Sequence, residues 1–412
     1  MLLLCINILI ENFKFNNLIK YMKILAIQNF GTSGTTLMHS YLDGHPQVLS
    51  LPGLFGYEAY KLWFSKYSNL THDNIISEHL NDFNYFFDSN THLQEVHGLN
   101  DMGDNHNKNA SIDKDLYLKY FEDFFPEKFT RKDFYISMMK SYNLALGRDI
   151  TNAQYMVFPI HSQKKSVAQA LCEDFEHVYF LYMLREPIQN IGSLAKHIAK
   201  NTVWLKVNAL ESAISQIYSD ESQHIGRYKV HGIVPYYKTS NSTYGALKLE
   251  DLHSNKHESL AALCKWLSID WNDCLLDSTF CGYKWWNRKE SARVNGQNEE
   301  TIGQKHIDIL NIYDKERIVS IGKMIKTYYP AKDNAKYNFL SFLPIFEFEK
   351  DIEYYKNRVE YIFKRLKLKT KLSRLLWPLI WALDYINIRR IIIRSHIFQN
   401  KQQAELELIY NK

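Results

Sequence analysis

The residues with the clearest chemical potential form a short turn rich in glycine and hydroxyl side chains near the N-terminus. They are Gly31, Thr32, Ser33, Gly34, Thr35 and Thr36. An apolar run at 23–29 precedes them and predicts a buried strand, and apolar residues at helical spacing follow from Thr35. In such a turn the backbone N–H groups converge on an anion, and the helix N-terminus adds partial positive charge. The pattern therefore predicts a phosphate-binding loop, with an ordinary strand-to-helix turn as the alternative.

A second candidate anion site follows another apolar run, at 177–184. Arg185 comes directly after this predicted strand, Pro187 suits the first turn of a helix, and Ser193 lies about two turns further on. A guanidinium grips a phosphate through two parallel hydrogen bonds, although an arginine after a strand can equally form a surface ion pair. The order strand, Arg, Pro, helix, Ser is more specific than any one of these residues.

The first loop differs from that of nucleotide triphosphatases. Thr35 stands where those proteins carry a lysine, and no strand ends in an aspartate suited to Mg²⁺. We therefore expect no metal. A P-loop kinase-type phosphotransferase remains an alternative, and a magnesium requirement would identify it.

Strands predicted at 23–29, 155–160, 177–184 and 245–249 alternate with helical segments. This alternation indicates an α/β fold of the P-loop-NTPase type, with a parallel sheet covered by helices on both faces. Ligands of such sheets bind beyond the carboxyl ends of the strands, where both candidate anion sites are expected.

The predicted domain organisation has three parts. Residues 1–22 form an N-terminal extension, which is dispensable or a weak membrane anchor, and residues 23–330 form the α/β domain. Within that domain, residues 57–150 read as a largely helical insertion on the acceptor side. Residues 331–412 read as a helical basic tail, and its part 361–396 carries nine Lys and Arg but only one acidic residue. This part either lies on an anionic membrane surface or packs as a helix pair.

Composition narrows the class of partner. The chain has 412 residues, 46% of them hydrophobic, and a net charge of +5. That charge suits a small anionic ligand but is too weak for a nucleic-acid binder. The five cysteines show neither metal-ligand spacing nor a disulfide framework, which favours a reducing compartment. We expect a cytoplasmic protein, with peripheral contact at the inner membrane face as the further possibility.

Together these motifs resemble the two cofactor-binding elements of the sulfotransferase family, in its bacterial type, over roughly residues 23–305. The segments that carry the resemblance are FGTSGTTLMHSYLDGHPQV (30–48), YFLYMLREPIQNIGSL (179–194), LKLEDLHSNKHESLAALCKWLSIDW (247–271), STFCGYKWWNR (278–288) and ARVNGQ (292–297).

The resemblance implies a donor, 3′-phosphoadenosine-5′-phosphosulfate (PAPS), whose sulfuryl group passes to a hydroxyl or amine. It implies that the first loop cradles the 5′-phosphosulfate and that Arg185 and Ser193 bind the 3′-phosphate. Arg293 and Gly296 fall near the family's closing loop and are candidate cofactor-binding residues, with a solvated basic loop as the alternative.

One residue departs from the family pattern. Thr32 replaces the Lys or Arg that touches the bridging oxygen, and loss of such a cation costs roughly 3–4 kcal/mol of transition-state stabilisation. A substitute could come from elsewhere in the chain, and the candidates are Lys164, Lys165, Lys284 and Arg293. Without one, the protein would be slow or would bind the nucleotide without turnover.

On the acceptor side, His161 ends the strand at 155–160 and is a candidate general base. The resemblance supports this role, and a structural strand-end histidine is the alternative. Glu58 is a second candidate base, whereas His39 is expected to pack inside the first helix and Glu250 to hold structure. We expect the acceptor to be a carbohydrate, such as a surface or lipid-linked glycan, or a small molecule.

Overall fold

The structure is a computed structural model. It describes residues 22–28, 33–53, 62–160, 165–201, 224–225, 228–229, 239–289, 292–296, 302, 315, 318 and 407–410.

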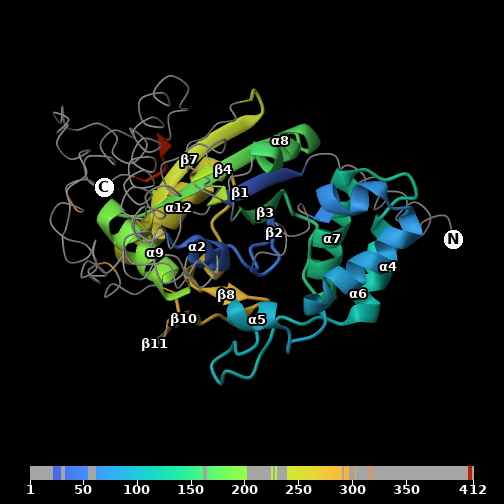
Figure 1. Cartoon of the computed structure of the whole chain (residues 1–412), viewed down its shortest axis with the longest axis horizontal. Helices are drawn as coiled ribbons and strands as arrows, with labels where there is room; N and C mark the ends of the chain where they lie inside the picture. The colour runs from blue at the N-terminus through green and yellow to red at the C-terminus, as the bar shows by residue number, and fades with distance from the viewer. Residues whose placement is uncertain are drawn as a thin grey trace, which may run out of the picture.

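A six-stranded sheet forms the centre of the described chain (Figure 1). Its strands, in spatial order, are β12 (Glu407–Leu408), β7 (Ser242–Lys248), β4 (Val178–Leu184), β1 (Lys23–Gln28), β3 (Tyr155–Ile160) and β2 (Val48–Leu49). Every neighbouring pair is parallel. The strands are nearly continuous apolar runs because both faces of the sheet are covered.

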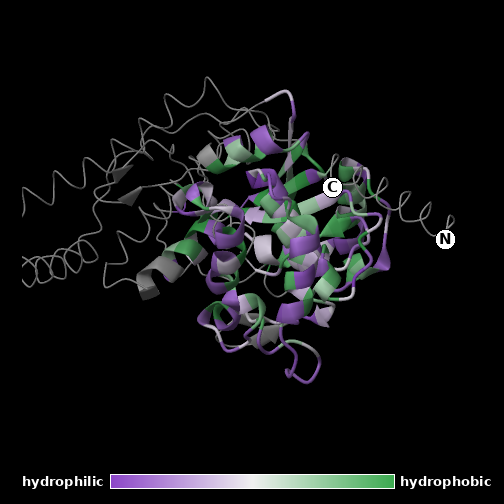
Figure 2. Ribbon diagram, turned by 90° about the vertical axis from the view of Figure 1, so that its right-hand side faces the viewer, coloured by the Kyte–Doolittle hydropathy of each residue, from purple (hydrophilic) through white to green (hydrophobic). Residues whose placement is uncertain are grey.

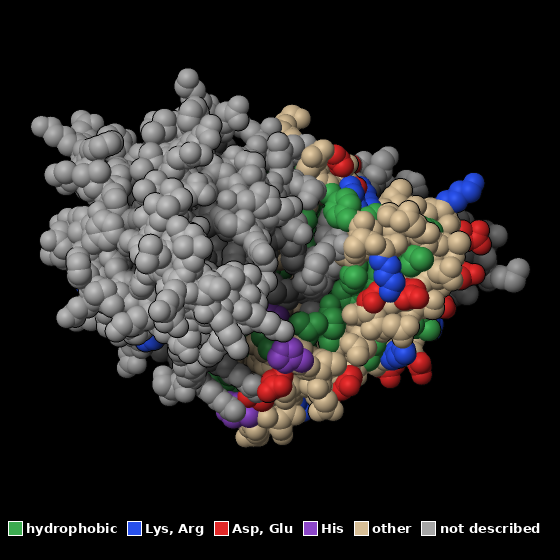
Figure 3. All heavy atoms as spheres, viewed as in Figure 1, with side chains coloured by type: hydrophobic (Ala, Val, Ile, Leu, Met, Phe, Trp, Pro, Cys, Tyr) green, Lys and Arg blue, Asp and Glu red, His purple; other side chains and the backbone are tan. Residues whose placement is uncertain are grey.

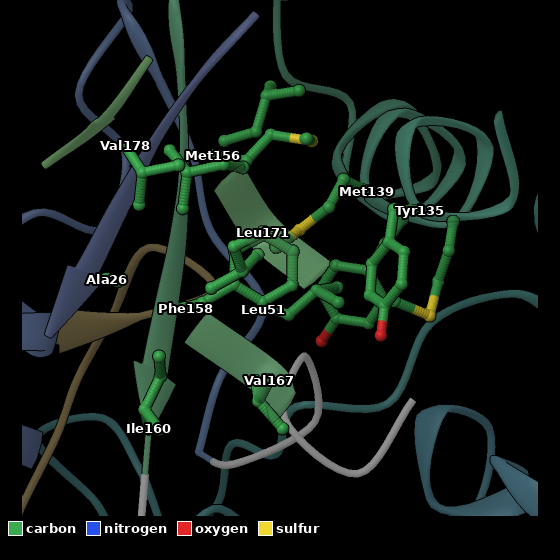
Figure 4. Close-up of a cluster of buried hydrophobic side chains, with 14 of the residues drawn as sticks. Ala26, Leu51, Tyr135, Met139, Met156, Phe158, Ile160, Val167, Leu171 and Val178 are labelled. Carbon is green, nitrogen blue, oxygen red and sulfur yellow. The ribbon is translucent and has the colours of Figure 1, made fainter. Parts of the chain in front are cut away.

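Helices pack on both faces, which confirms the predicted α/β class. The apolar side chains of one face meet α2 (Thr35–Tyr41), α11 (Leu249–Ser254) and α12 (Lys256–Leu267). Those of the other face meet three further helices, namely α7 (Arg131–Ala145), α8 (Lys165–Asp174) and α9 (Pro187–Asn201). Figure 4 shows part of this second core, where side chains of β3 such as Phe158 meet Tyr135 and Met139 of α7.

A helical layer extends the second face. It contains α4 (His72–Asp82), α5 (His92–Val96), α6 (Lys114–Phe124) and α7, with short 3-10 helices η1 (Tyr67–Asn69) and η2 (Asn84–Phe86). A capping box at Thr130 and Asp133 fixes the start of α7. Aromatic rings fill the interior of this layer. Hydrophilic residues lie along its outer helices (Figure 2). The described part of 57–150 is therefore largely helical.

Short hairpins complete the described chain. They are β5 (His224–Ile225) with β6 (Tyr228–Lys229), β8 (Thr279–Phe280) with β9 (Tyr283–Lys284), and β10 (Asn287–Lys289) with β11 (Ala292–Val294). The 3-10 helix η3 (Asp273–Leu276) precedes β8.

The structure refines the predicted elements at two places. Strand β7 begins at Ser242 rather than 245, because its pairing with β4 runs from Val178–Ser242 to Leu184–Lys248. Leu249, predicted as the last strand residue, begins α11 instead.

Most of the predicted C-terminal tail, including 361–396, lies outside the described residues, as does the N-terminal extension before Met22. Near the end of the chain, Glu407 and Leu408 form strand β12 rather than helix. Within the described chain, no helix combines the length and the apolar character needed to cross a membrane.

Candidate functional site

The strand order places the two candidate anion sites next to each other. From β1 the chain passes to β2 and β3 on one side of the sheet, and then crosses to β4 and β7 on the other side. The order therefore reverses between β1 and β4, which are hydrogen-bonded neighbours. Because the sheet is parallel, the loop after β1 and Arg185 after β4 leave at the same carboxyl edge. Open α/β sheets bind their ligands at this kind of switch point.

The first element is the turn that ends at Gly34. Gly34 has a φ of 86° in the left-handed region, and its carbonyl accepts the N–H of Met38 at 2.9 Å to begin α2. A Cβ at this position would collide with Leu249 Cδ1. The left-handed backbone conformation therefore requires glycine, and a Cβ would fit only if the Leu249 side chain shifted. Thr35 donates through Oγ1 to the carbonyl of Gln28 at 3.5 Å, which ties the helix start to the strand end.

The second element is the turn at Arg185. The Arg185 side chain is only 8% exposed, and burial lowers the pKa of its guanidinium. Glu250 and Glu186 oppose this lowering because their negative charges lie near the guanidinium. Glu250 Oε1 accepts the backbone N–H of Glu186 at 2.8 Å, and Glu186 Oε2 accepts that of Gln189 at 2.8 Å. The turn into α9 is thus held by carboxylates.

Three other predicted cofactor-binding residues lie outside the turns at Gly34 and Arg185. Ser193 is half-buried in α9, roughly 9 Å along the axis from Pro187. It can reach a phosphate at Arg185 only if the ligand lies along the helix. Gly296, with a φ of 62°, packs at the C-terminal end of α2, since a Cβ there would lie 3.3 Å from Tyr41 Oη. Arg293 pairs with Arg288 across the β10–β11 hairpin.

The remaining predicted residues lie outside the described residues. They are the candidate bases His161 and Glu58, the loop residues Gly31 and Thr32, and Lys164, whereas its neighbour Lys165 is the first residue of α8. Their roles stay predictions. The site that the structure describes therefore consists of Ser33 to Thr36 and the turn at Arg185.

Two residues with roles predicted from the sequence, His39 and Lys284, form contacts with other side chains. His39 is fully buried, its Nε2 is 2.8 Å from Ser50 Oγ, and burial lowers its pKa to about 4, so the expected packing role is confirmed. Lys284, a candidate replacement cation, donates to Asp104 at 3.2 Å and covers the Trp286 ring at 4.9 Å. The Lys284 amine therefore already forms an ion pair with Asp104.

Figure 3 shows a hollow lined by hydrophobic side chains, over the region where Figure 1 draws β2, α5 and α7. Histidine side chains lie at its margin. Across the described part of the chain, no group of three or more His, Cys, Asp or Glu side chains is arranged to hold a metal ion.

The structural role expected for Glu250 is confirmed, whereas the contact made by Leu249 was not predicted from the sequence. Leu249 packs against Gly34, and Glu250 holds the turn at Arg185. The signal was visible in part, because an acidic residue follows the predicted strand at 245–249. Spacing alone could not reveal which loops it would contact.

Three solved structures resemble this chain weakly. The sulfotransferase domain from the curacin biosynthetic pathway has 15% identity and a TM-score of 0.37, covering 73% of this chain and 97% of its own. The sulfotransferase domain of the Synechococcus PCC 7002 olefin synthase has 14% identity and a TM-score of 0.30, covering 78% and 92%. A sulfotransferase from Mycobacterium avium has 13% identity and a TM-score of 0.29, covering 62% and 66%.

No family model and no curated protein matches the chain. At such low identities and TM-scores, the assignment of function rests on the site itself.

Proposed function

We propose that this chain is a sulfotransferase that moves a sulfuryl group from PAPS to a hydroxyl or amine of an acceptor. One observation carries the proposal. A turn that requires glycine at position 34 and a buried arginine at position 185 leave adjacent parallel strands at the switch point of the sheet. Two such elements side by side suit a ligand with two separate phosphate groups, and the resemblance of both motifs to the sulfotransferase family supports PAPS.

In this proposal each described element has a binding role. The backbone N–H groups of Ser33, Thr35 and Thr36, with the hydroxyls of Ser33 and Thr36, orient the 5′-phosphosulfate for in-line attack. Arg185 binds the 3′-phosphate through charge-assisted hydrogen bonds, which are strong at a buried position. Ser193, Arg293 and Gly296 are proposed to complete the nucleotide site.

The acceptor side is proposed to lie next to the helical layer. The hydrophobic hollow near β2, α5 and α7 suits the apolar face of a sugar ring or of a small molecule (Figure 3). His161 or Glu58 would take the proton from the attacking hydroxyl. A basic stretch at 361–396 supports contact of a cytoplasmic protein with the anionic inner membrane face, where a lipid-linked glycan would be found.

The test is calorimetric binding of adenosine 3′,5′-bisphosphate (PAP), the spent donor, without metal. We expect micromolar affinity in the wild type and a loss of about 100-fold in Arg185→Ala, because a charge-assisted phosphate contact at a buried site is worth roughly 2–5 kcal/mol. Absence of PAP binding, or tight binding of ATP only with Mg²⁺, would refute the proposal and favour the kinase. PAP binding without transfer to any acceptor would identify a nucleotide-binding protein without turnover.

A further inference from the structure

The residues after β7 contact both elements of the proposed nucleotide site. Strand β7 lies beside β4 and ends at Lys248, which pairs with Leu184, the residue before Arg185. The chain then turns directly into α11, so that Leu249 and Glu250 stand at the same carboxyl edge of the sheet as Arg185.

Leu249 reaches across to the first element. Its side chain is 8% exposed and belongs to the core between the sheet and α2. Cδ1 of Leu249 lies in the space that a Cβ on Gly34 would need, whereas Cγ, at 3.4 Å from that Cβ position, would be in ordinary van der Waals contact. Leu249 therefore packs directly against the turn at Gly34.

Glu250 holds the second element. Its Oε1 accepts the backbone N–H of Glu186 at 2.8 Å, directly after Arg185 in the chain. The Glu250 carboxylate is also close enough to the Arg185 guanidinium to act on its pKa. One hydrogen bond thus fixes the backbone from which Arg185 extends.

We infer that Leu249 and Glu250 are positioning residues that fix the spacing between the Gly34 turn and Arg185, so that the site selects nucleotides phosphorylated at both the 5′ and the 3′ position. This inference rests on the proposed function. Two phosphate groups on one ligand gain affinity from each other only when both binding elements are held at the matching separation. A ligand with one phosphate does not depend on that separation.

The experiment compares three probes, PAP, 5′-AMP and 3′-AMP, on the full chain. We expect the wild type to bind PAP far more tightly than either monophosphate. Leu249→Ala and Glu250→Ala should each weaken PAP about tenfold while changing 5′-AMP and 3′-AMP less than about twofold. The preference for the doubly phosphorylated nucleotide is the readout, and a general loss of folding would not produce this pattern.

Two control variants separate positioning from stability. Leu260→Ala opens a cavity in the same core, at a fully buried residue of α12 away from Gly34, and should keep the preference for PAP. Glu250→Gln keeps an oxygen that can accept the Glu186 N–H, so this variant should also keep the preference for PAP.

Failure of the inference differs from failure of the proposed function. A wild type that binds PAP no better than 5′-AMP would refute the proposed function. If the wild type prefers PAP and both Leu249→Ala and Glu250→Ala retain that preference, the positioning role alone is refuted. Equal loss in Glu250→Gln and Glu250→Ala would refute the hydrogen bond as its cause.

Discussion

The carboxyl edge of the sheet and the helical layer of α4 to α7 use buried polar groups in different ways. In the helical layer, buried His79 donates through Nδ1 to the carbonyl of Ile75, four residues earlier in its own helix, and its ring stacks on Phe121 with the ring centroids 4.2 Å apart. At the carboxyl edge, buried Arg185 follows β4, and Glu250, whose charge acts on it, lies in α11 after β7. Local partners stabilise an element, whereas long-range partners set the geometry between elements.

The two regions should therefore respond differently to substitution. Changes in the helical layer should lower the free energy of unfolding and leave nucleotide affinity intact. Changes at the carboxyl edge should lower affinity at a smaller cost in stability.

The largest effect is expected where the C-terminal end of α2 contacts the end of α7. Asp43, just after α2, binds Arg148, just after α7, through two hydrogen bonds of 2.8 Å, and its side chain is 1% exposed. Asp43 also accepts the N–H of Gly282 at 3.0 Å. Asp43→Ala should lower the unfolding free energy by about 3–5 kcal/mol, because it leaves the partly buried Arg148 charge without its buried carboxylate partner. Urea unfolding at pH 7 measures this.

A double variant checks the mechanism. In Asp43→Ala with Arg148→Met the unpaired charge is gone, so the loss should be smaller than in Asp43→Ala alone. An equal or greater loss would mean that packing, rather than the ion pair, explains the result.

The next effect is a pH dependence that belongs to the helical layer. Burial lowers the pKa of His79 from 6.5 to about 4. Between these values the unfolded chain takes up a proton at His79 and the folded protein does not. The unfolding free energy should therefore fall as the pH decreases from about 6.5 to about 4, by roughly 3 kcal/mol for this residue.

His79→Phe removes this titration. In urea unfolding at a series of pH values, the fall in unfolding free energy should therefore be roughly 3 kcal/mol smaller than in the wild type. His39 is a useful comparison, because burial also lowers its pKa to about 4 in α2, beside the site. An unchanged pH profile in His79→Phe would contradict the assignment.

A smaller effect, on affinity, should appear at Gly34. Gly34→Ala forces a left-handed residue and a collision with Leu249, and we expect PAP affinity to fall by about 2 kcal/mol, or roughly 30-fold. Gly44 is a matched control, because it is also left-handed, with a φ of 76°, but has open space around it. Gly44→Ala should keep PAP affinity, and equal losses in both variants would show that the contact with Leu249 is unimportant.

The smallest effect tests the helical layer alone. Thr130 Oγ1 accepts the N–H of Asp133 at 3.3 Å, and Asp133 Oδ2 accepts the N–H of Thr130 at 2.8 Å. Thr130→Ala should lower the unfolding free energy by about 1 kcal/mol. PAP affinity should not change, and a change would mean that the helical layer and the site are coupled more strongly than their contacts suggest.

The sequence by itself determined the local elements and their order. The apolar runs of β1, β3 and β4 and the helical spacing after Thr35 predicted the α/β class, which the structure confirms. It also placed Gly34 and Arg185 at strand ends. These features are readable because burial repeats with the period of the backbone, and because glycine and proline mark turns within a few residues.

Only the tertiary structure decided which of these elements meet. The contact of Gly34 with Leu249 spans more than two hundred residues of chain, and Glu250 reaches Glu186 from α11, which follows the next strand of the sheet. Strand β12 joins the edge of β7 from the far end of the chain. No spacing encodes such contacts, since the neighbours of a strand depend on how all the apolar faces pack at once. The geometry of the site is a property of that packing.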